Sequence, residues 1–250
     1  MLVNVQKYQL LPIYKTYIYL IYFMKFYEVS KEDEYLFMGK RRRLVEQLKE
    51  KGIKDVRVLA AIGKIPRHLF FDVSTARPAL LDHAYSDKAL PIGAGQTISH
   101  PYTVAFQTEK LEVKPGEKVL EIGTGCGYQT AVLLEIGAKV YSIERQKTLH
   151  DKTKLFLPYI GYSTQKLVFG DGYKGLPSFA PFDKIIVTAG APYIPNDLLM
   201  QLKVGGIMVI PIGEGEDQEM NILKKTGPTS FEKQVIGRFK FVPLLQNKAS

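Results

Sequence analysis

The chain has 250 residues, of which 46% are hydrophobic, 24% charged and 11% aromatic. This composition is typical of a folded globular protein and excludes a peptide-sized scaffold, a disordered chain and a collagen-like chain. Lys and Arg outnumber Asp and Glu by 34 to 25, for a formal charge of +9. The excess does not by itself indicate nucleic-acid binding, because the densest basic run, residues 40–43, has no aromatic side chains between its charges.

Cys126 is the single cysteine, so an internal disulfide and a Cys-rich zinc site are excluded. Such cysteine usage is typical of a reducing compartment, and we expect a cytoplasmic protein. His68, His83 and His150 are scattered without the spacing of metal ligands, so no metal site is expected.

We expect residues 1–37 to be an N-terminal extension and residues 38–250 to be one domain. Three lysines interrupt the apolar stretch 1–27, whose uncharged runs are too short for a membrane span of about 20 residues. The stretch also lacks the order of charge, apolar core and cleavage site of a secretory signal, and no membrane partner is expected. Three interpretations stay open: an artefact of the start site, with Met24 or Met38 as the true start, an amphipathic or partner-binding segment, and an added strand or helix.

Two short helices are predicted at the start of the domain. Leu44 and Leu48 lie one turn apart, which predicts a helix over residues 39–51. Asp55 can cap a second helix, which ends before Pro66.

The next region is rich in Gly, Pro and Ser. Residues 82–100 predict a loop with room for one short strand, and loops of this length usually carry function. Pro101 fits the first position of a helix that runs to about residue 112.

Strands and helices alternate in the remainder of the chain. This alternation predicts an α/β, Rossmann-like fold, in which a mostly parallel sheet has helices on both faces. The last two strands have no helix between them, so an antiparallel C-terminal edge is expected. The predicted strands are 118–122, 139–143, 166–169, 184–187, 207–212, 218–224 and 234–241, and the helices among them are 129–136 and 146–159.

A glycine-rich turn follows the first strand of this series. Gly123, Gly125 and Gly127 permit a sharp turn and the close approach of a nucleotide-like ligand. A dinucleotide site would have its third glycine at position 128, where this chain has Tyr, and no carboxylate at position 121, where this chain has Glu. Both departures disfavour NAD and favour a sulfonium cofactor with an amino-acid tail, whose ammonium group Glu121 could attract directly or through water.

Two further strands also end at acidic residues. Glu144 lies about 20 residues after the first glycine, where a carboxylate can accept hydrogen bonds from both ribose hydroxyls. Asp171 and Gly172 form a short acidic turn that can meet an adenine ring. We therefore expect the cofactor to lie across these strand ends.

The chain resembles the protein-L-isoaspartate (D-aspartate) O-methyltransferase family. The resemblance rests on Leu-Pro-Ile-Gly-Ala-Gly-Gln-Thr-Ile-Ser-His-Pro-Tyr at 90–102 and on Lys-Val-Leu-Glu-Ile-Gly-Thr-Gly-Cys-Gly-Tyr at 118–128. It covers roughly residues 39–245, and Gln-Thr-Ile-Ser is its most specific element. Two residues depart from the family pattern: Ala94 stands where His is frequent, and His100 where Gln or Ala is common.

The resemblance implies methylation, with S-adenosylmethionine as donor, of the carboxylate of isoaspartyl and D-aspartyl residues in damaged proteins. Residues 38–100 would then form the substrate side and 101–250 the cofactor-binding core of a methyltransferase domain. The implied cofactor-binding residues are Glu121, Gly123, Thr124, Gly125, Gly127, Glu144, Asp171 and Gly172.

The implied catalytic residues are Ser99 and Thr97, and the implied substrate-binding residues are Gln96, Ile98 and His100. An isoaspartyl carboxylate, with a reference pKa near 4, is already ionised at neutral pH, so no general base is needed. We expect the two hydroxyls to orient it, assisted by the amides of the helix that begins at Pro101.

Two other functions remain open. An RNA base methyltransferase would fit the charge and the cofactor fold, but the strand end at Thr188 offers no carboxylate for a base. A binding module that has lost transfer is disfavoured by the presence of Ser99 and Glu144. We expect isoaspartyl proteins as partners, no nucleic acid, and a monomer.

Overall fold

The computed structural model describes residues 31–71 and 81–249. The interpretations of residues 1–30 therefore lie outside the described residues. None of the helices in these two ranges is long and apolar enough to cross a bilayer.

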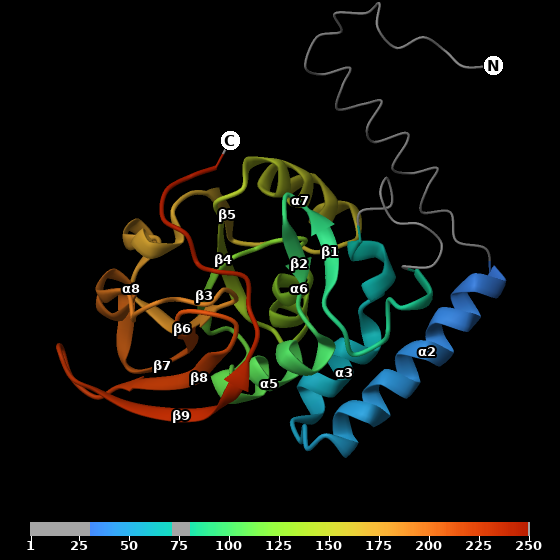
Figure 1. Cartoon of the computed structure of the whole chain (residues 1–250), viewed down its shortest axis with the longest axis horizontal. Coiled ribbons are helices and arrows are strands. Elements are labelled where there is room, and N and C mark those ends of the chain that lie inside the picture. Colours follow the sequence, from blue (N-terminus) through green and yellow to red (C-terminus); the bar gives the residue numbers. More distant parts are fainter. Residues whose placement is uncertain (1–30, 72–80, 250) are drawn as a thin grey trace, which may run out of the picture. The chain divides into compact units, whose positions relative to one another are not determined.

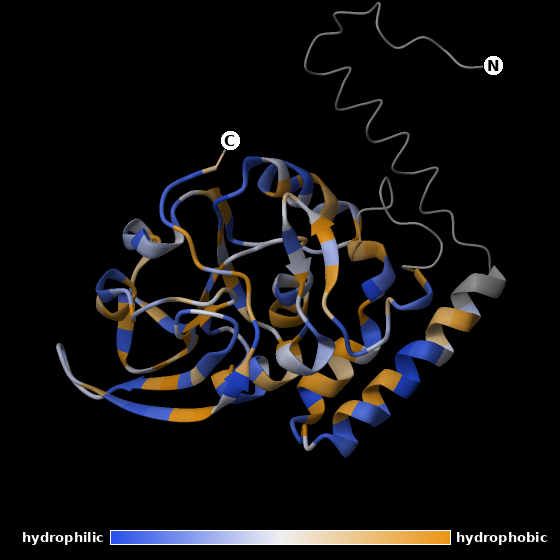
Figure 2. Ribbon diagram, in the orientation of Figure 1, coloured by the Kyte–Doolittle hydropathy of each residue, from blue (hydrophilic) through white to orange (hydrophobic). Residues whose placement is uncertain are grey.

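Helix α2 (Lys31–Glu50) starts well before the predicted position 39. Hydrophilic and hydrophobic residues alternate along the helix (Figure 2). The chain divides into two units after Gly39, inside this helix.

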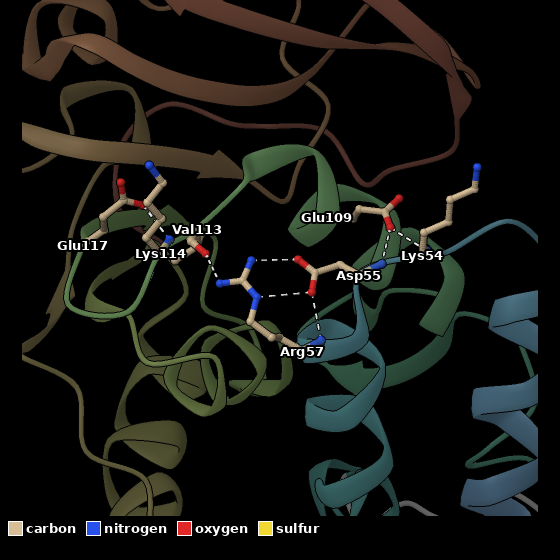
Figure 3. Close-up of polar contacts among 7 residues, drawn as sticks. All are labelled: Lys54, Asp55, Arg57, Glu109, Val113, Lys114 and Glu117. Atoms are coloured by element: carbon tan, nitrogen blue, oxygen red, sulfur yellow. Dashed lines mark hydrogen bonds and ion pairs between the residues drawn. The ribbon is translucent and has the colours of Figure 1, made fainter.

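Helix α3 (Val56–Lys64) begins as predicted at Asp55, whose carboxylate accepts the Arg57 N–H at 2.8 Å. Figure 3 shows how this start is tied to the end of helix α5 (Pro101–Leu111). Arg57 donates to the Val113 carbonyl at 2.8 Å, and the Glu109 carboxylate accepts the two main-chain N–H groups just before α3, at 2.6 and 2.7 Å. These bonds fix the position of α5, which ends in the segment leading to the central sheet.

The central sheet has seven strands in the order β5-β4-β3-β6-β7-β8-β9 (Figure 1). The first five strands of that order are parallel, and β8 and β9 are antiparallel to their neighbours, as predicted. The strands are β3 (Lys118–Ile122), β4 (Lys139–Glu144), β5 (Lys166–Phe169), β6 (Phe182–Val187), β7 (Leu202–Ile212), β8 (Gln218–Lys225) and β9 (Phe231–Phe239).

Two strands, β7 and β9, differ most from the sequence prediction. β7 begins at Leu202 rather than 207, because Phe182 of β6 pairs with Leu202 before a register shift. β9 begins at Phe231 and ends at Phe239, rather than spanning 234–241, because its pairing with β8 runs from Lys225 to Gln218. Its polar, exposed sequence hides this pairing from a hydrophobicity pattern.

Helices cover both faces of the sheet. On one face, Gln107 of α5 donates to the Val187 carbonyl at 3.0 Å, and Thr130 of α6 (Tyr128–Glu135) donates to Glu121. The other face carries a buried apolar core that includes Leu120, Ile122 and Leu198 of α8 (Asn196–Gln201). The remaining helical elements are α7 (Lys147–Tyr159), η2 (Arg67–Phe70), η3 (Gly172–Lys174) and η4 (Pro177–Phe179).

The predicted loop 82–100 contains a small antiparallel hairpin of β1 (Leu90–Gly93) and β2 (Gln96–Ile98). Its turn requires left-handed backbone at Ala94, which has a φ of 50°. The residue that departs from the family pattern therefore lies in the turn of a hairpin, and the hairpin leads directly to Ser99.

Candidate active site

A cavity lies at the carboxyl ends of β3, β4 and β6, the region where α/β sheets of this type bind ligands. Counting the part open to solvent, its volume is about 780 Å³. The hairpin supplies one wall, the glycine turn a second and the C-terminal segment a third. Its lining residues include Gln96, Thr97, Ile98, Ser99, Gly123, Thr124, Gly125, Tyr128, Glu144, Arg145, Gly172, Thr188 and Val242 to Leu245.

Gly123 opens the glycine turn with a φ of +97°, in the left-handed region. A Cβ on this residue would lie 2.4 Å from Thr188 Oγ1. The Thr188 hydroxyl approaches so closely because it donates to the Gly123 carbonyl at 2.7 Å. The strand end of β6 thus holds the turn, and only glycine fits there.

We expect Gly123→Ala to destabilise the protein by about 2 kcal/mol more than Gly116→Ala, and to weaken cofactor binding. Gly116 is the matched control, because it has a similar φ of +84° but nothing within 4 Å of its Cβ position. Left-handed backbone costs alanine about 1 kcal/mol at either position, whereas the clash is confined to Gly123. Urea unfolding of both variants measures the difference, and equal losses would contradict the contact.

Glu144 ends β4 and is buried, with its carboxylate at the cavity. One oxygen accepts the Gly125 N–H at 2.8 Å and the other accepts the Gln146 N–H at 2.7 Å. A carboxylate has about four lone-pair positions, so two remain for the hydroxyls of a ligand. The side chain is thus held rigidly in the place predicted for a ribose contact.

Ser99 and Thr97 lie together on the hairpin side of the cavity. Neither hydroxyl has a hydrogen-bond partner among residues 31–71 and 81–249, so both can donate to a ligand. Gln96 and Ile98, which we expect on the substrate side, line the same cavity.

The amides of helix α5 offer less to an anion than predicted. Pro101 is the first helical residue, as expected, but it has no N–H. The N–H of Tyr102 donates to the Asp87 carboxylate at 2.9 Å. Because the Asp87 carboxylate already occupies this position, the start of α5 attracts a substrate carboxylate less than we expected.

Comparison with known proteins identifies the family. The family model described as Protein-L-isoaspartate(D-aspartate) O-methyltransferase matches residues 39–249. The chain belongs to this family. A protein-L-isoaspartate O-methyltransferase from Christiangramia forsetii is 60% identical over 217 residues, covering 87% of this chain and 99% of that one. The enzyme of the same name from Flavobacterium psychrophilum is 60% identical over 210 residues, covering 84% and 96%.

Solved structures of the same family share the fold. One protein-L-isoaspartate O-methyltransferase has a TM-score of 0.73 at 30% identity, covering 83% of this chain and 66% of that one. A structure from Plasmodium falciparum, titled as a putative enzyme of this kind in complex with S-adenosyl-L-homocysteine, has a TM-score of 0.71 at 24% identity, covering 83% and 99%. The predicted Rossmann-like methyltransferase fold is confirmed.

Glu121, part of the family's glycine-turn segment, does not line the cavity. Its side chain is fully buried beneath the turn, and one oxygen accepts hydrogen bonds from Thr130 at 2.5 Å and Ser142 at 2.7 Å. The other oxygen has no partner among the described residues. Burial raises the pKa of Glu121 to about 7, with Glu144 adding to the shift against the two hydrogen bonds. In this geometry the Glu121 carboxylate does not reach the cavity, so it cannot contact an ammonium group there directly.

We expect Glu121→Gln to stabilise the cofactor-free protein at pH 8.5 relative to pH 5. The folded-state pKa of Glu121 lies above its unfolded value of 4.5, so its stabilising contribution is complete below 4.5 and lost as pH rises through about 7. Glutamine removes this titration, so the variant should gain up to about 3 kcal/mol between the two pH values. Urea unfolding of both proteins measures the gain, and a pH-independent difference would count against the buried carboxylate.

Three other predicted site residues stand outside the cavity lining. The Asp171 carboxylate accepts N–H groups from Tyr173 and Asn247, both at 2.9 Å, so it caps η3 and holds the C-terminal segment. Gly127 makes room for α7, because a Cβ there would lie 2.9 Å from Thr153. His100 precedes α5 and makes no side-chain cap.

Sequence reasoning missed the C-terminal wall of the cavity, residues 242–245. The Gly190 N–H donates to the Val242 carbonyl at 2.8 Å, and the Leu244 N–H donates to the Gly190 carbonyl at 2.7 Å. In Figure 1 this red segment runs from the end of β9 to the C-terminus. Arg145 holds its far end by donating to the Asn247 carbonyl at 3.1 Å. The Phe-Val-Pro-Leu sequence at 241–244, inside the stretch that resembles the family, was the one available signal for this wall.

Proposed function

We propose that this cavity is where the chain methylates the carboxylate of L-isoaspartyl and D-aspartyl residues, with S-adenosyl-L-methionine as donor. The observation that carries the proposal is that Ser99 and Thr97, whose hydroxyls have no partner among the described residues, share one cavity with the glycine turn and Glu144. Membership of the protein-L-isoaspartate O-methyltransferase family supports the same activity. Methylation of the abnormal carboxylate begins the repair of damaged proteins.

The residues present fit the cofactor. Thr188 packs against Gly123 so closely that this position has to be glycine. Because glycine has no Cβ, a ligand can approach the main chain of the turn. Glu144 keeps lone pairs for two ribose hydroxyls, and Gly172 gives an adenine ring access beside Ile143. S-adenosyl-L-methionine supplies, when bound, an electrophilic methyl group on a sulfonium centre.

The protein's part in the transfer is to position groups and exclude water. The substrate carboxylate is ionised near neutral pH, so no proton has to be removed: its oxygen would bond the methyl carbon as the sulfur–methyl bond breaks and the sulfur leaves as a neutral thioether. Ser99 and Thr97 would donate hydrogen bonds that orient the carboxylate in line with the methyl group. The apolar wall of Val242 and Leu244 reduces the water that competes for both reactants.

The same observations give less support to the two alternative functions, an RNA base methyltransferase and a binding module. An RNA base methyltransferase would use a carboxylate or amide at the end of β6, where the cavity is lined by Thr188 and Ala189. A binding module without transfer would not require the hydroxyls to face the cavity. We further propose a cytoplasmic monomer without a nucleic-acid partner; the single cysteine supports the location.

One assay separates these functions. Labelled S-adenosyl-L-methionine is offered with an isoaspartyl peptide, its normal aspartyl twin, and transfer RNA. We expect base-labile label on the isoaspartyl peptide alone. Base-stable label on the RNA would favour the alternative enzyme, and label on none of the three would favour the module.

A further inference from the structure

Arg67, the first residue of η2, is completely buried although it carries a permanent charge. Its Nε donates to the Ala84 carbonyl at 2.9 Å, and its Nη2 donates to the Ser99 carbonyl at 3.0 Å and the Lys88 carbonyl at 3.3 Å. All three acceptors are main-chain atoms of the segment that leads into α5. One side chain therefore holds this segment at three points, and one of them is Ser99, which lines the cavity.

No carboxylate forms an ion pair with Arg67 among residues 31–71 and 81–249. Asp87 is a carboxylate whose charge acts on Arg67, but it bonds Lys51 at 2.5 Å and the Tyr102 N–H at 2.9 Å instead. Nη1 of Arg67 is buried without a hydrogen-bond partner in the same ranges. An uncompensated buried cation is costly, so stability alone gives no reason for it.

The charge of Arg67 lies directly behind a wall of the cavity. Its guanidinium carbon is 4.7 Å from the ring centroid of Tyr128, and Tyr128 lines the cavity. The other groups that face this charge are Phe71, with its ring centroid at 5.7 Å, and the thiol of Cys126 and the hydroxyl of Tyr85. Burial raises the pKa of Tyr128, and the charge of Arg67 opposes that rise.

We propose that Arg67 is a positioning residue for methyl transfer: it aligns Ser99 through the carbonyl oxygen and supplies, from behind Ser99 and Tyr128, the positive charge that attracts the substrate carboxylate. The inference rests on the proposed function of the cavity. The charge of Arg67 also replaces an attraction that α5 does not supply. Pro101 has no N–H, and the N–H of Tyr102 already donates to Asp87. The Arg67 charge can attract the substrate carboxylate without touching it, because little water screens a charge in the protein interior.

Two substitutions separate alignment from charge. Arg67→Lys, assayed at about pH 5.5 so that a buried ammonium group stays protonated, keeps the charge and loses the planar fork that holds three carbonyls. Arg67→Met loses both the charge and the fork while filling much of the space. The first readout is the turnover number on an isoaspartyl peptide. The second, with S-adenosyl-L-homocysteine bound so that no transfer occurs, is the ratio of affinities for that peptide and its isoasparaginyl twin, which carries a neutral amide.

We expect the wild type to prefer the acid over the amide by about tenfold or more. Arg67→Lys should keep that preference and lose about tenfold in turnover number. Arg67→Met should lose the preference and about 100-fold in turnover number, an effect comparable to losing one positioned donor.

Lys225→Met is the matched control. Lys225 is also a buried cation, and it donates to the carbonyls of Leu199 and Leu202, both at 2.8 Å, away from the cavity lining. This variant should lose stability and keep the acid preference. Affinity for S-adenosyl-L-homocysteine shows in each variant whether the cofactor site has folded.

A wild type that binds acid and amide equally would overturn the proposal, as would an Arg67→Met variant that binds S-adenosyl-L-homocysteine normally and keeps the preference. Should Arg67→Met fail to fold, Arg67→Lys decides: a lower turnover number with the preference retained supports the proposal, and unchanged turnover overturns it. A wild type inactive on the isoaspartyl peptide would instead reject the proposed function itself.

Discussion

Replacing Ser99 with alanine is expected to lower the turnover number on an isoaspartyl peptide by about one to three orders of magnitude. The hydroxyl has no partner among the described residues and lies at the cavity, so its loss removes a donor that acts on the substrate carboxylate. Affinity for S-adenosyl-L-homocysteine should change by no more than a few fold, because Ser99 is not among the expected cofactor contacts. Initial rates at saturating cofactor measure the first effect, and calorimetric titration the second.

The control for this substitution is Ser178→Ala. Ser178 lies in η4, is exposed, and does not line the cavity, so its removal should leave turnover unchanged. If Ser99→Ala turned over substrate at the wild-type rate, its hydroxyl would have no part in orienting the carboxylate.

Glu144→Ala is expected to raise the dissociation constant for S-adenosyl-L-homocysteine by about 100-fold or more. A buried carboxylate that accepts hydrogen bonds from two ribose hydroxyls contributes about 1.5–3 kcal/mol for each bond, and about 1.4 kcal/mol corresponds to tenfold in affinity. The loss should be larger than for Glu144→Gln, whose amide keeps one acceptor oxygen. Titration calorimetry gives the dissociation constant of each variant and shows which of the two has lost more affinity.

Asp151→Asn serves as the comparison for Glu144. Asp151 is an exposed carboxylate on the neighbouring helix α7, paired with Lys147 at 2.6 Å, and it is not part of the cavity lining. Its loss should leave cofactor affinity unchanged. A dissociation constant for Glu144→Ala within threefold of the wild type would place the ribose elsewhere.

The parts of the fold that depend on local signals were predictable from the sequence. Pro101 marks the start of α5, Asp55 caps α3, and alternating apolar segments give β3, α6, β4, α7 and β5 in order. The helix α8 was missed because its six residues are too few for a periodic pattern. The early start of β7 depends on pairing with β6 across the sheet, which no local pattern contains.

The site was predictable where the main chain determines it, and less so where a neighbouring element decides whether a side chain is covered. Glu121 and Glu144 lie on the same face of the sheet, but Glu121 is level with Ser142, before the strand ends, and bonds Thr130 of α6, so it does not line the cavity. Asp171 is short enough to bond the nearby Tyr173 N–H, and it caps a turn. Val242 and Leu244 reach the cavity through contacts with Gly190, about fifty residues earlier in the chain, which only the folded topology brings together.

The most direct test is a calorimetric titration of the purified chain with S-adenosyl-L-homocysteine, followed by an isoaspartyl peptide. We expect one cofactor site per chain, and then a second binding event that the normal aspartyl twin does not produce. A protein that is folded yet releases no heat with S-adenosyl-L-homocysteine would contradict the assignment of the cavity, and with it every role proposed for the residues around it.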